Sequence, residues 1–411
     1  MKRQSLSDKP LTPLPGFLPV RGSFFASKVN RTILLAHPDG SVPISSCFRK
    51  IPYGCGVPAV KVAAVFTGGT IGSSSVGGVK SLDGSKDDIV MGFFDDSDTV
   101  VRSSPYSILS ENLDGDRISS LIAHVASILD DDYDGIIITH GTDTIQYATA
   151  ALGYAFGSDT VPITVVSGNA PLGEEGSNAE DNIRAAVDFI RNRRGRGVFV
   201  PYLNSDGAVY VHRGARLLPH PEYEDSLASV CGTYYGRYVG GRYEPNPHYH
   251  ETADAAEPIG PVALGTLSLG IMVVNPYPGM GIPEPAPGVT DVLLDTYHSG
   301  TFPESAIHGG FLDGCSKRGI RVWIAGRDPD IVYESMSGIS GVRILPRMSL
   351  IAAYMKIWMS VAAGRDPDTI SEPLGSDIAL RRYLSSEAQS FKNQPGDVQA
   401  WNHSQSQPYS S

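Results

Sequence analysis

Short apolar runs alternate with helical periodicity from residue 61 onward, and this alternation most constrains what the chain can fold into. The runs VAAVF, GIIIT, PITVVS and GVFVPY have strand length, and amphipathic patterns near 118–129, 144–156 and 179–192 separate them. Strands that are apolar throughout are typical of parallel sheets covered by helices on both faces. We therefore expect an α/β fold whose larger, N-terminal, doubly wound sheet domain spans residues 61–237.

A second, shorter series of the same kind follows, and a chain of 411 residues is long enough to bury two cores. GIMVVN, VTDVLLDTY and GIRVWIAG precede an amphipathic segment, and together they predict a smaller C-terminal α/β domain over residues 268–375. Gly, Pro and His are frequent in 238–267, which we expect to be a linker or long loop. Residues 1–60 are rich in Pro, Gly and Ser and are expected to be an N-terminal extension. The tail at 376–411 is expected to be partly disordered.

Composition excludes several classes of function. The formal charge of −11 and a pI of about 5.4 leave no basic field for phosphates, so we expect no nucleic-acid partner. Neither a signal peptide nor a membrane-length apolar run is visible, so we expect a soluble cytoplasmic protein with no membrane partner. The cysteines lack clustered C-x-x-C spacing, which predicts free thiols and no metal site. They are Cys47, Cys55, Cys231 and Cys315.

Two polar loops follow predicted strands. VAAVF runs into Thr67–Thr70, and GIIIT runs into His140–Thr144. In an open parallel sheet, ligands bind beyond the carboxyl ends of the strands, where both loops are expected. Gly69 is a candidate for substrate binding, since glycine permits a close backbone approach. A threonine hydroxyl becomes a nucleophile only beside an activating group, so a catalytic Thr70 needs partners close by.

Each loop also has alternative interpretations, one as a phosphate-binding loop and the others purely structural. Gly72 and Gly77 have phosphate-loop spacing, but Gly78 and Val79 stand where such a loop needs Lys and Ser or Thr. Asp143 lies where the first turn of a helix favours a carboxylate whatever its function. Taken alone, Thr70 fits a turn cap and His140 a packed loop residue.

The two loops together resemble the hallmarks TGGTI and HGTDT of the bacterial-type asparaginase and glutaminase family. SILSENL, SGNAPLGEEGSNAEDNIRAA, NPYPGM, TYHSGTFP and RILPRMSLIAAYMKIWM are similar to further family segments in the same order. The resemblance covers most of residues 61–365. It implies hydrolysis of a side-chain amide to a carboxylate and ammonia, through an acyl-enzyme on threonine, with no metal and no cofactor.

The resemblance also assigns roles to individual residues. Thr70 matches the nucleophile, Thr142 the second threonine, and Asp143 the aspartate that holds the substrate's α-ammonium. Ser110 and Glu111 match the pair that contacts the amino-acid head group. Such a grip on charged groups remote from the amide would position the amide carbon against the nucleophile.

The chain departs from the family pattern on the loop after TGGTI. The family has a tyrosine there that assists the nucleophile, whereas residues 71–105 contain none. Lys80 falls near that place and is a candidate catalytic base, because desolvation lowers the pKa of an amine. The alternative is that Lys80 is a solvated loop residue without such a role. Tyr106 is another candidate to replace the family tyrosine.

A second departure concerns the family lysine that pairs with the second threonine and the aspartate. Pro219 falls at or beside its position, with Arg216 and His220 nearby. Proline cannot transfer a proton. Asn178 stands where the family usually has an aspartate. Either the catalytic apparatus is rebuilt for a related amide, or hydrolysis has been lost.

These observations favour an amidohydrolase that acts on asparagine or a related amino-acid amide. A catalytically silent member that binds an amino acid or a partner protein is the alternative. A third hypothesis is an ammonia-releasing subunit of a transamidating complex, in which the N-terminal extension would have a docking role. The expected partners are a small amino-acid amide and, by resemblance, further copies of the chain in a homodimer or homotetramer.

Overall fold

The structure is a computed structural model in which the chain divides into two units, Met1–Gly56 and Val57–Ser411. The structure describes residues 58–76, 79–82, 86–252, 254, 256–265, 270–304, 307, 310–326, 333–336 and 339–379. The expected N-terminal extension up to residue 57 and the tail beyond residue 379 lie outside the described residues. Within the described residues, no helix has both the length and the apolar composition needed to cross a membrane.

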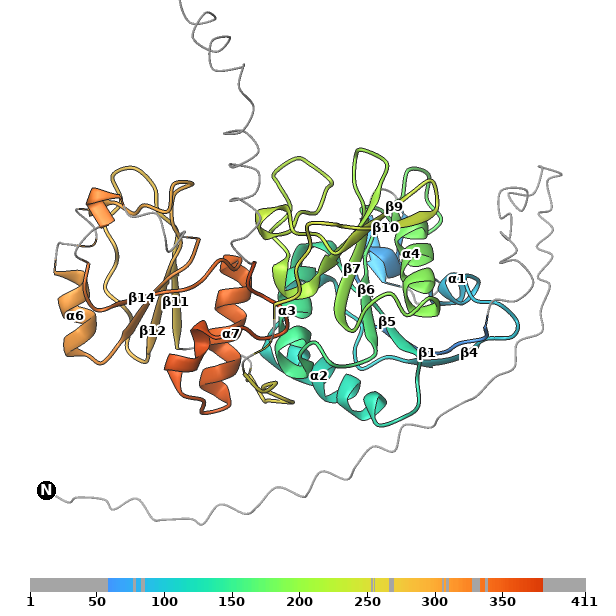
Figure 1. The fold of residues 1–411 in the computed structure, drawn as a ribbon, viewed down its shortest axis with the longest axis horizontal. Helices are drawn as coiled ribbons and strands as arrows, with labels where there is room; N and C mark the ends of the chain where they lie inside the picture. The colour runs from blue at the N-terminus through green and yellow to red at the C-terminus, as the bar shows by residue number, and fades with distance from the viewer. Residues whose placement is uncertain are drawn as a thin grey trace, which may run out of the picture. The chain divides into compact units, whose positions relative to one another are not determined.

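The larger sheet has eight strands in the order β10-β9-β8-β7-β6-β5-β1-β4 (Figure 1). Their bounds are β1 Lys61–Phe66, β4 Thr99–Ser103, β5 Gly135–Thr139, β6 Pro162–Val166, β7 Gly197–Leu203, β8 Val209–Arg213, β9 Gly236–Val239 and β10 Arg242–Pro245. Strands β4, β1, β5, β6 and β7 pair in parallel, whereas β8, β9 and β10 add antiparallel strands at the β7 side. The carboxyl ends of the parallel strands therefore share one edge of the sheet.

Helices cover both faces of this sheet. Helices α2 (Gly115–Leu129) and α3 (Ile145–Phe156) pack in one core, and α1 (Asp87–Met91) and α4 (Ala179–Arg191) contribute to a second. Successive residues of β1 alternate between the cores, with Val65 in the first and Phe66 in the second. A strand buried on both faces must be apolar throughout, which explains the continuous runs in the sequence. The predicted doubly wound α/β domain is confirmed.

The smaller sheet has four parallel strands in the order β11-β12-β13-β14. The strands are β11 Ile271–Val274, β12 Asp291–Leu294, β13 Arg321–Ile324 and β14 Val342–Ile344, and the accompanying helices are α6 Phe311–Lys317 and α7 Leu350–Ala362. Phe311 of α6 packs on one face and Ile357 of α7 on the other. Met355 of α7 packs in the core that contains α3, so this helix contributes to the cores of both sheets. The predicted smaller C-terminal α/β domain is confirmed.

Several elements were not evident from the sequence. β4 (TVVRS) and β8 (VYVHR) carry polar and charged residues, so neither shows the apolar run of a central strand. The expected domain end at residue 237 falls inside β9, because the β9–β10 hairpin completes the larger sheet. The expected start of the tail at residue 376 falls beside Asp377, a fully buried residue. The pairing of β9 with β10 and the burial of Asp377 determine the two limits, and periodicity reports neither.

Candidate active site

Two polar loops leave the larger sheet side by side because β1 and β5 are neighbouring parallel strands that end level with each other. Phe66 lies opposite Thr139 in the register. The hydroxyl of Thr67 donates to the carbonyl of Thr139 at 2.6 Å, and the Thr67 N–H donates to the Thr139 hydroxyl at 3.3 Å. The two strand ends are therefore tied together before either loop turns away from the sheet.

The loops touch at Gly69 and Gly141, and neither position has room for a side chain. A Cβ atom on Gly69 would lie 2.5 Å from the Gly141 Cα, and one on Gly141 would overlap the side chain of Ser110. Gly69 has φ 79° and ψ −179°, a region that essentially only glycine occupies. Thr70 and Thr142 each follow one glycine of this contact. The paired glycines therefore bring the backbones of the two threonines together.

Ser110 adds a third segment to the same place. The amide of Gly69 donates to the carbonyl of Ile108 at 2.9 Å, which aligns the chain before Ser110 with the glycine loop. The hydroxyl of Ser110 donates to Asp143 Oδ2 at 3.3 Å, and the hydroxyl of Thr144 donates to the Ser110 carbonyl at 2.8 Å. A buried serine thus holds the aspartate of the second loop, whose side chain is exposed.

The structure gathers most of the predicted site residues at one edge of the larger sheet. Thr70 and Thr142 are half-buried, whereas Asp143 and Glu111 are exposed. Each lies in a single turn of 3-10 helix at Thr70–Gly72, Ser110–Asn112 or Thr142–Thr144. Their catalytic and binding roles stay predictions. Exposed carboxylates beside half-buried hydroxyls can bind a small molecule that carries an ammonium group.

Lys80 lies in a separate two-stranded hairpin made of β2 (Ser73–Val76) and β3 (Val79–Leu82). In its antiparallel register, Lys80 lies opposite Ser75. The hairpin returns to the glycine loop, because a Cβ atom on Gly68 would lie 3.1 Å from the Leu82 side chain. The proposed role of Lys80 as a base is not tested by this geometry and stays a prediction.

Two other candidate proton carriers have structural explanations. Burial raises the pKa of the Tyr106 hydroxyl well above its usual value. It therefore stays protonated at neutral pH. Arg216 is fully buried, and its guanidinium donates to the Ser376 carbonyl at 2.7 Å and to the Thr252 hydroxyl at 2.9 Å. These hydrogen bonds hold the segment that follows α7, and they occupy the Arg216 guanidinium.

Asn178 and His140 also have structural roles. The backbone N–H of Asn169 donates to the side-chain oxygen of Asn178 at 3.0 Å. The backbone N–H of Asn178 donates to the side-chain oxygen of Asn169, also at 3.0 Å. Asn178 also donates through its side-chain amide to the Leu203 carbonyl, a bond that an ionised aspartate could not make. The Nδ1–H of His140 donates to the carbonyl of Gly141 at 2.9 Å, and burial lowers the pKa of His140.

Two histidines that the sequence did not single out as a pair lie on β8 and in the segment that follows it. His212 on β8 is 1% exposed, and its Nδ1 lies 2.8 Å from the Ser229 hydroxyl. His220 lies in the following loop, where its Nδ1–H donates to the Ser226 carbonyl at 3.1 Å. The Nε2 atoms of both rings are buried without a partner among the described residues. The sequence named His220 only for its place beside Pro219, and no local pattern marks His212 within its strand.

Lowering the pH from 6.5 towards 4 should destabilise the protein through His212. The unfolded chain protonates this imidazole near pH ~6.5, whereas burial, helped by the nearby His220, lowers the pKa in the folded protein to about 3. Between these values the unfolded state binds the extra proton, so the free energy of unfolding falls as the pH falls. The expected slope is about 1.4 kcal/mol per pH unit. Urea unfolding at pH 6.5, 5.5 and 4.5 measures it.

The matched variant His212→Asn keeps a polar atom near Ser229 and removes the titrating ring. Its unfolding free energy should depend less steeply on pH than that of the wild type. His298→Asn replaces an exposed histidine and should keep the wild-type slope. Identical slopes in His212→Asn and wild type would contradict the assignment.

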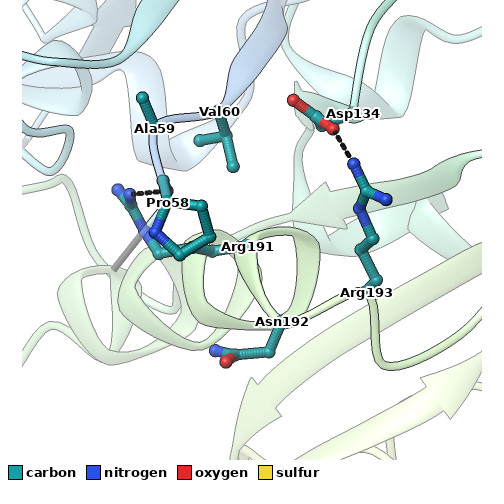
Figure 2. Close-up of a pocket in the computed structure, with 7 residues that line it drawn as sticks. All are labelled: Pro58, Ala59, Val60, Asp134, Arg191, Asn192 and Arg193. Atoms are coloured by element: carbon teal, nitrogen blue, oxygen red, sulfur yellow. Dashed lines mark hydrogen bonds and ion pairs between the residues drawn. The ribbon is translucent and has the colours of Figure 1, made fainter. Parts of the chain in front are cut away.

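A cavity of about 390 Å³ lies at the opposite edge of the larger sheet. Figure 2 shows its lining residues, which come from the chain before β1, from the start of β5 and from the end of α4. Arg193 pairs with Asp134 at 2.7 Å, and Arg191 donates to both carboxylate oxygens of Asp98. These arginines are neutralised by carboxylates of the same chain, and the cavity is separate from the glycine loops.

Part of the chain matches a known protein family. Residues 61–244 match the family model described as Asparaginase, N-terminal. One subunit of a glutamyl-tRNA(Gln) amidotransferase from Haloquadratum walsbyi is 27% identical over 301 residues, which are 69% of this chain and 64% of that protein. The chain spans less than two thirds of the length of the curated relatives it matches.

Solved structures share the fold. The thermostable L-asparaginase from Thermococcus kodakarensis is 21% identical with a TM-score of 0.63, and covers 78% of this chain and 100% of its own. L-asparaginase I from Vibrio cholerae is 19% identical with a TM-score of 0.65, and covers 79% of this chain and 100% of its own. The predicted family resemblance is confirmed.

The prediction about partners is wrong. It allowed a small amino-acid amide and further copies of the chain in a homodimer or homotetramer, and it excluded nucleic acid. Several relatives, including the one from Haloquadratum walsbyi, carry the name of one subunit of an amidotransferase for glutamyl-tRNA(Gln). A protein named as one subunit of an enzyme functions with other protein subunits, so the relatives have protein partners that charge and composition could not indicate.

Proposed function

Because residues 61–244 match the asparaginase family model, we propose that the chain hydrolyses the side-chain amide of asparagine or a related amino-acid amide and releases ammonia. The observation that supports this proposal is the contact of Gly69 with Gly141, which brings the backbones that lead to Thr70 and Thr142 together. We expect a small amino acid bound there to contact both threonines. Ser110 and Asp143, joined by a hydrogen bond, border the same point.

The proposed reaction begins with attack of the Thr70 hydroxyl on the amide carbon. The O–H bond breaks as the C–O bond forms, and the carbon–nitrogen bond then breaks as the nitrogen takes a proton and leaves as ammonia. Water hydrolyses the resulting ester to the carboxylate. The carboxylates of Asp143 and Glu111 hold the substrate's ammonium, which aligns the amide carbon with Thr70. Backbone amides of the glycine loops supply donors for the developing oxyanion.

Thr70→Ala should reduce ammonia release from a panel of L- and D-amino-acid amides by more than about 10³-fold, because the nucleophilic oxygen is gone. Thr70→Ser keeps a hydroxyl and should retain measurable release. A coupled assay for ammonia, run on asparagine, glutamine and their D-isomers, provides the measurement. Wild-type rates in Thr70→Ala would place the chemistry elsewhere. No release by the wild type from any amide would favour a silent, ligand-binding protein.

A second candidate is an ammonia-releasing subunit of a transamidating complex, which the names of the curated relatives favour. The test isolates the tagged full-length chain from its own cells and measures amidation of glutamyl-tRNA(Gln) by the recovered assembly. Amidation that is lost in the Thr70→Ala assembly supports this function. Rapid amide hydrolysis by the isolated chain together with no amidation by the assembly contradicts it.

A further inference from the structure

Hydrogen bonds hold the backbone on both sides of Thr70. The carbonyl of Gly69, in the peptide unit before Thr70, accepts from the Gly72 N–H at 3.1 Å. The carbonyl of Thr70, in the peptide unit after it, accepts from the backbone N–H of Ser73 and from the Ser73 hydroxyl, the latter at 2.8 Å. A peptide unit is planar and turns only about its flanking φ and ψ bonds. Anchoring both units therefore fixes the direction of the Cα–Cβ bond of Thr70.

The turn that carries Thr70 is also anchored at its two ends. The Gly69 N–H donates to the carbonyl of Ile108 at 2.9 Å. After Thr70, the side chain of Ile71 is 1% exposed and packs in the core that contains α4. The Ile71 carbonyl accepts from the Leu172 N–H at 3.4 Å. The half-buried side chain of Thr70 thus rises from a fixed backbone and keeps its own χ1 rotation.

Ser73 differs from the other anchors because it acts through its side chain. The remaining contacts are made by backbone atoms or by apolar packing, so substitution leaves those hydrogen bonds in place. Ser73 is 0% exposed, and a hydroxyl in such a position is expected to be hydrogen-bonded, as this one is to Thr70. Complete burial closes Ser73 to a substrate. It is therefore neither a second nucleophile nor a substrate-binding residue.

We propose that Ser73 is a positioning residue for the nucleophile: its hydroxyl, bound to the Thr70 carbonyl, aims the Thr70 side chain at the amide carbon. The inference rests on the proposed function. Attack is fast only when the reacting atoms are aligned, and a misplacement of about 1 Å can lower a rate by about 10²-fold. With Ser73 in place, the orientation of Thr70 is set on folding and is not searched for at each turnover.

Removal of the Ser73 hydroxyl separates this role from folding. In Ser73→Ala the backbone N–H of residue 73 can still donate to the Thr70 carbonyl, so no buried carbonyl loses its last partner. The Thr70 carbonyl then has one donor in place of two, and its peptide unit samples a wider range of orientations. We therefore expect the substitution to affect the alignment of Thr70 more than the stability of the protein.

Ser73→Ala should lower kcat for ammonia release by roughly 10–100-fold, with little change in KM, because the groups proposed to hold the amino acid are unchanged. The first turnover, measured by rapid quench, should slow as well, since attack by Thr70 precedes the release of ammonia. Ser73→Thr keeps a hydroxyl and should retain more of kcat than Ser73→Ala. Wild-type kcat in Ser73→Ala overturns the inference and leaves the proposed function intact.

Thr164→Val is the matched control. Thr164 lies in the middle of β6 and is 0% exposed, and its hydroxyl donates to the Ile136 carbonyl at 3.2 Å. This variant loses an equally buried hydroxyl away from the strand ends and should keep wild-type kcat. Urea unfolding verifies that both variants are folded in the assay. Equal losses of kcat in Thr164→Val and Ser73→Ala overturn the positioning role. If the wild type hydrolyses no amide, the proposed function fails and this inference with it.

Discussion

Asp377→Ala should lower the free energy of unfolding by about 3–5 kcal/mol, because it leaves a buried ammonium without its counter-charge. Lys356 Nζ on α7 lies 2.7 Å from Asp377 Oδ2, and the two side chains are 2% and 0% exposed. The hydroxyl of Tyr154 on α3 donates to the same carboxylate oxygen at 3.1 Å. The amide of Leu374 donates to the other oxygen at 3.1 Å. Urea unfolding followed by circular dichroism measures the loss.

The matched control is Asp368→Ala, which removes an exposed ion pair. Asp368 lies 3.0 Å from Arg343, with side chains 75% and 42% exposed, and such pairs contribute up to about 1 kcal/mol. The double variant Lys356→Met/Asp377→Leu removes both charges and should be more stable than Asp377→Ala alone. Equal losses in Asp377→Ala and Asp368→Ala would show that the buried pair contributes no more to the free energy of unfolding than the exposed pair.

Gly69→Ala should separate the two loops of the candidate site and abolish ammonia release. The new Cβ would lie 2.5 Å from the Gly141 Cα, and the backbone at φ 79°, ψ −179° is strained for any residue with a side chain. Backbone strain and overpacking together predict a loss of roughly 2–6 kcal/mol in the free energy of unfolding. Thermal unfolding and the ammonia assay together measure both consequences.

Gly72→Ala is the control in the same segment. No atom lies within 4 Å of a Cβ built on Gly72, and its φ is not positive. This variant should keep both the stability and the rate of the wild type. A Gly69→Ala protein with wild-type stability and rate would show that the contact with Gly141 is not needed, and the proposed function would lose its main support.

Much of the central fold could be predicted because local spacing encodes it. The apolar run before Thr67 is a strand in the structure, and so is the run before His140. The helix predicted at 144–156 begins at Ile145 and ends at Phe156. In each case a buried element needs apolar residues at a fixed period, and that period is visible in a single segment. The elements that the sequence did not reveal, such as β4 and β8, expose part of their surface or carry charges.

The sequence by itself determined which residues stand at the ends of the strands, and its two motifs identified Thr70, Thr142 and Asp143 as candidates. Only the tertiary structure decided that Gly69 meets Gly141 and that the Ser110 hydroxyl donates to Asp143. These contacts join segments far apart in the chain, and they depend on strand order, loop path and steric fit. Periodicity indicates which residues of a segment face the core. Packing between distant segments decides which polar groups share a site.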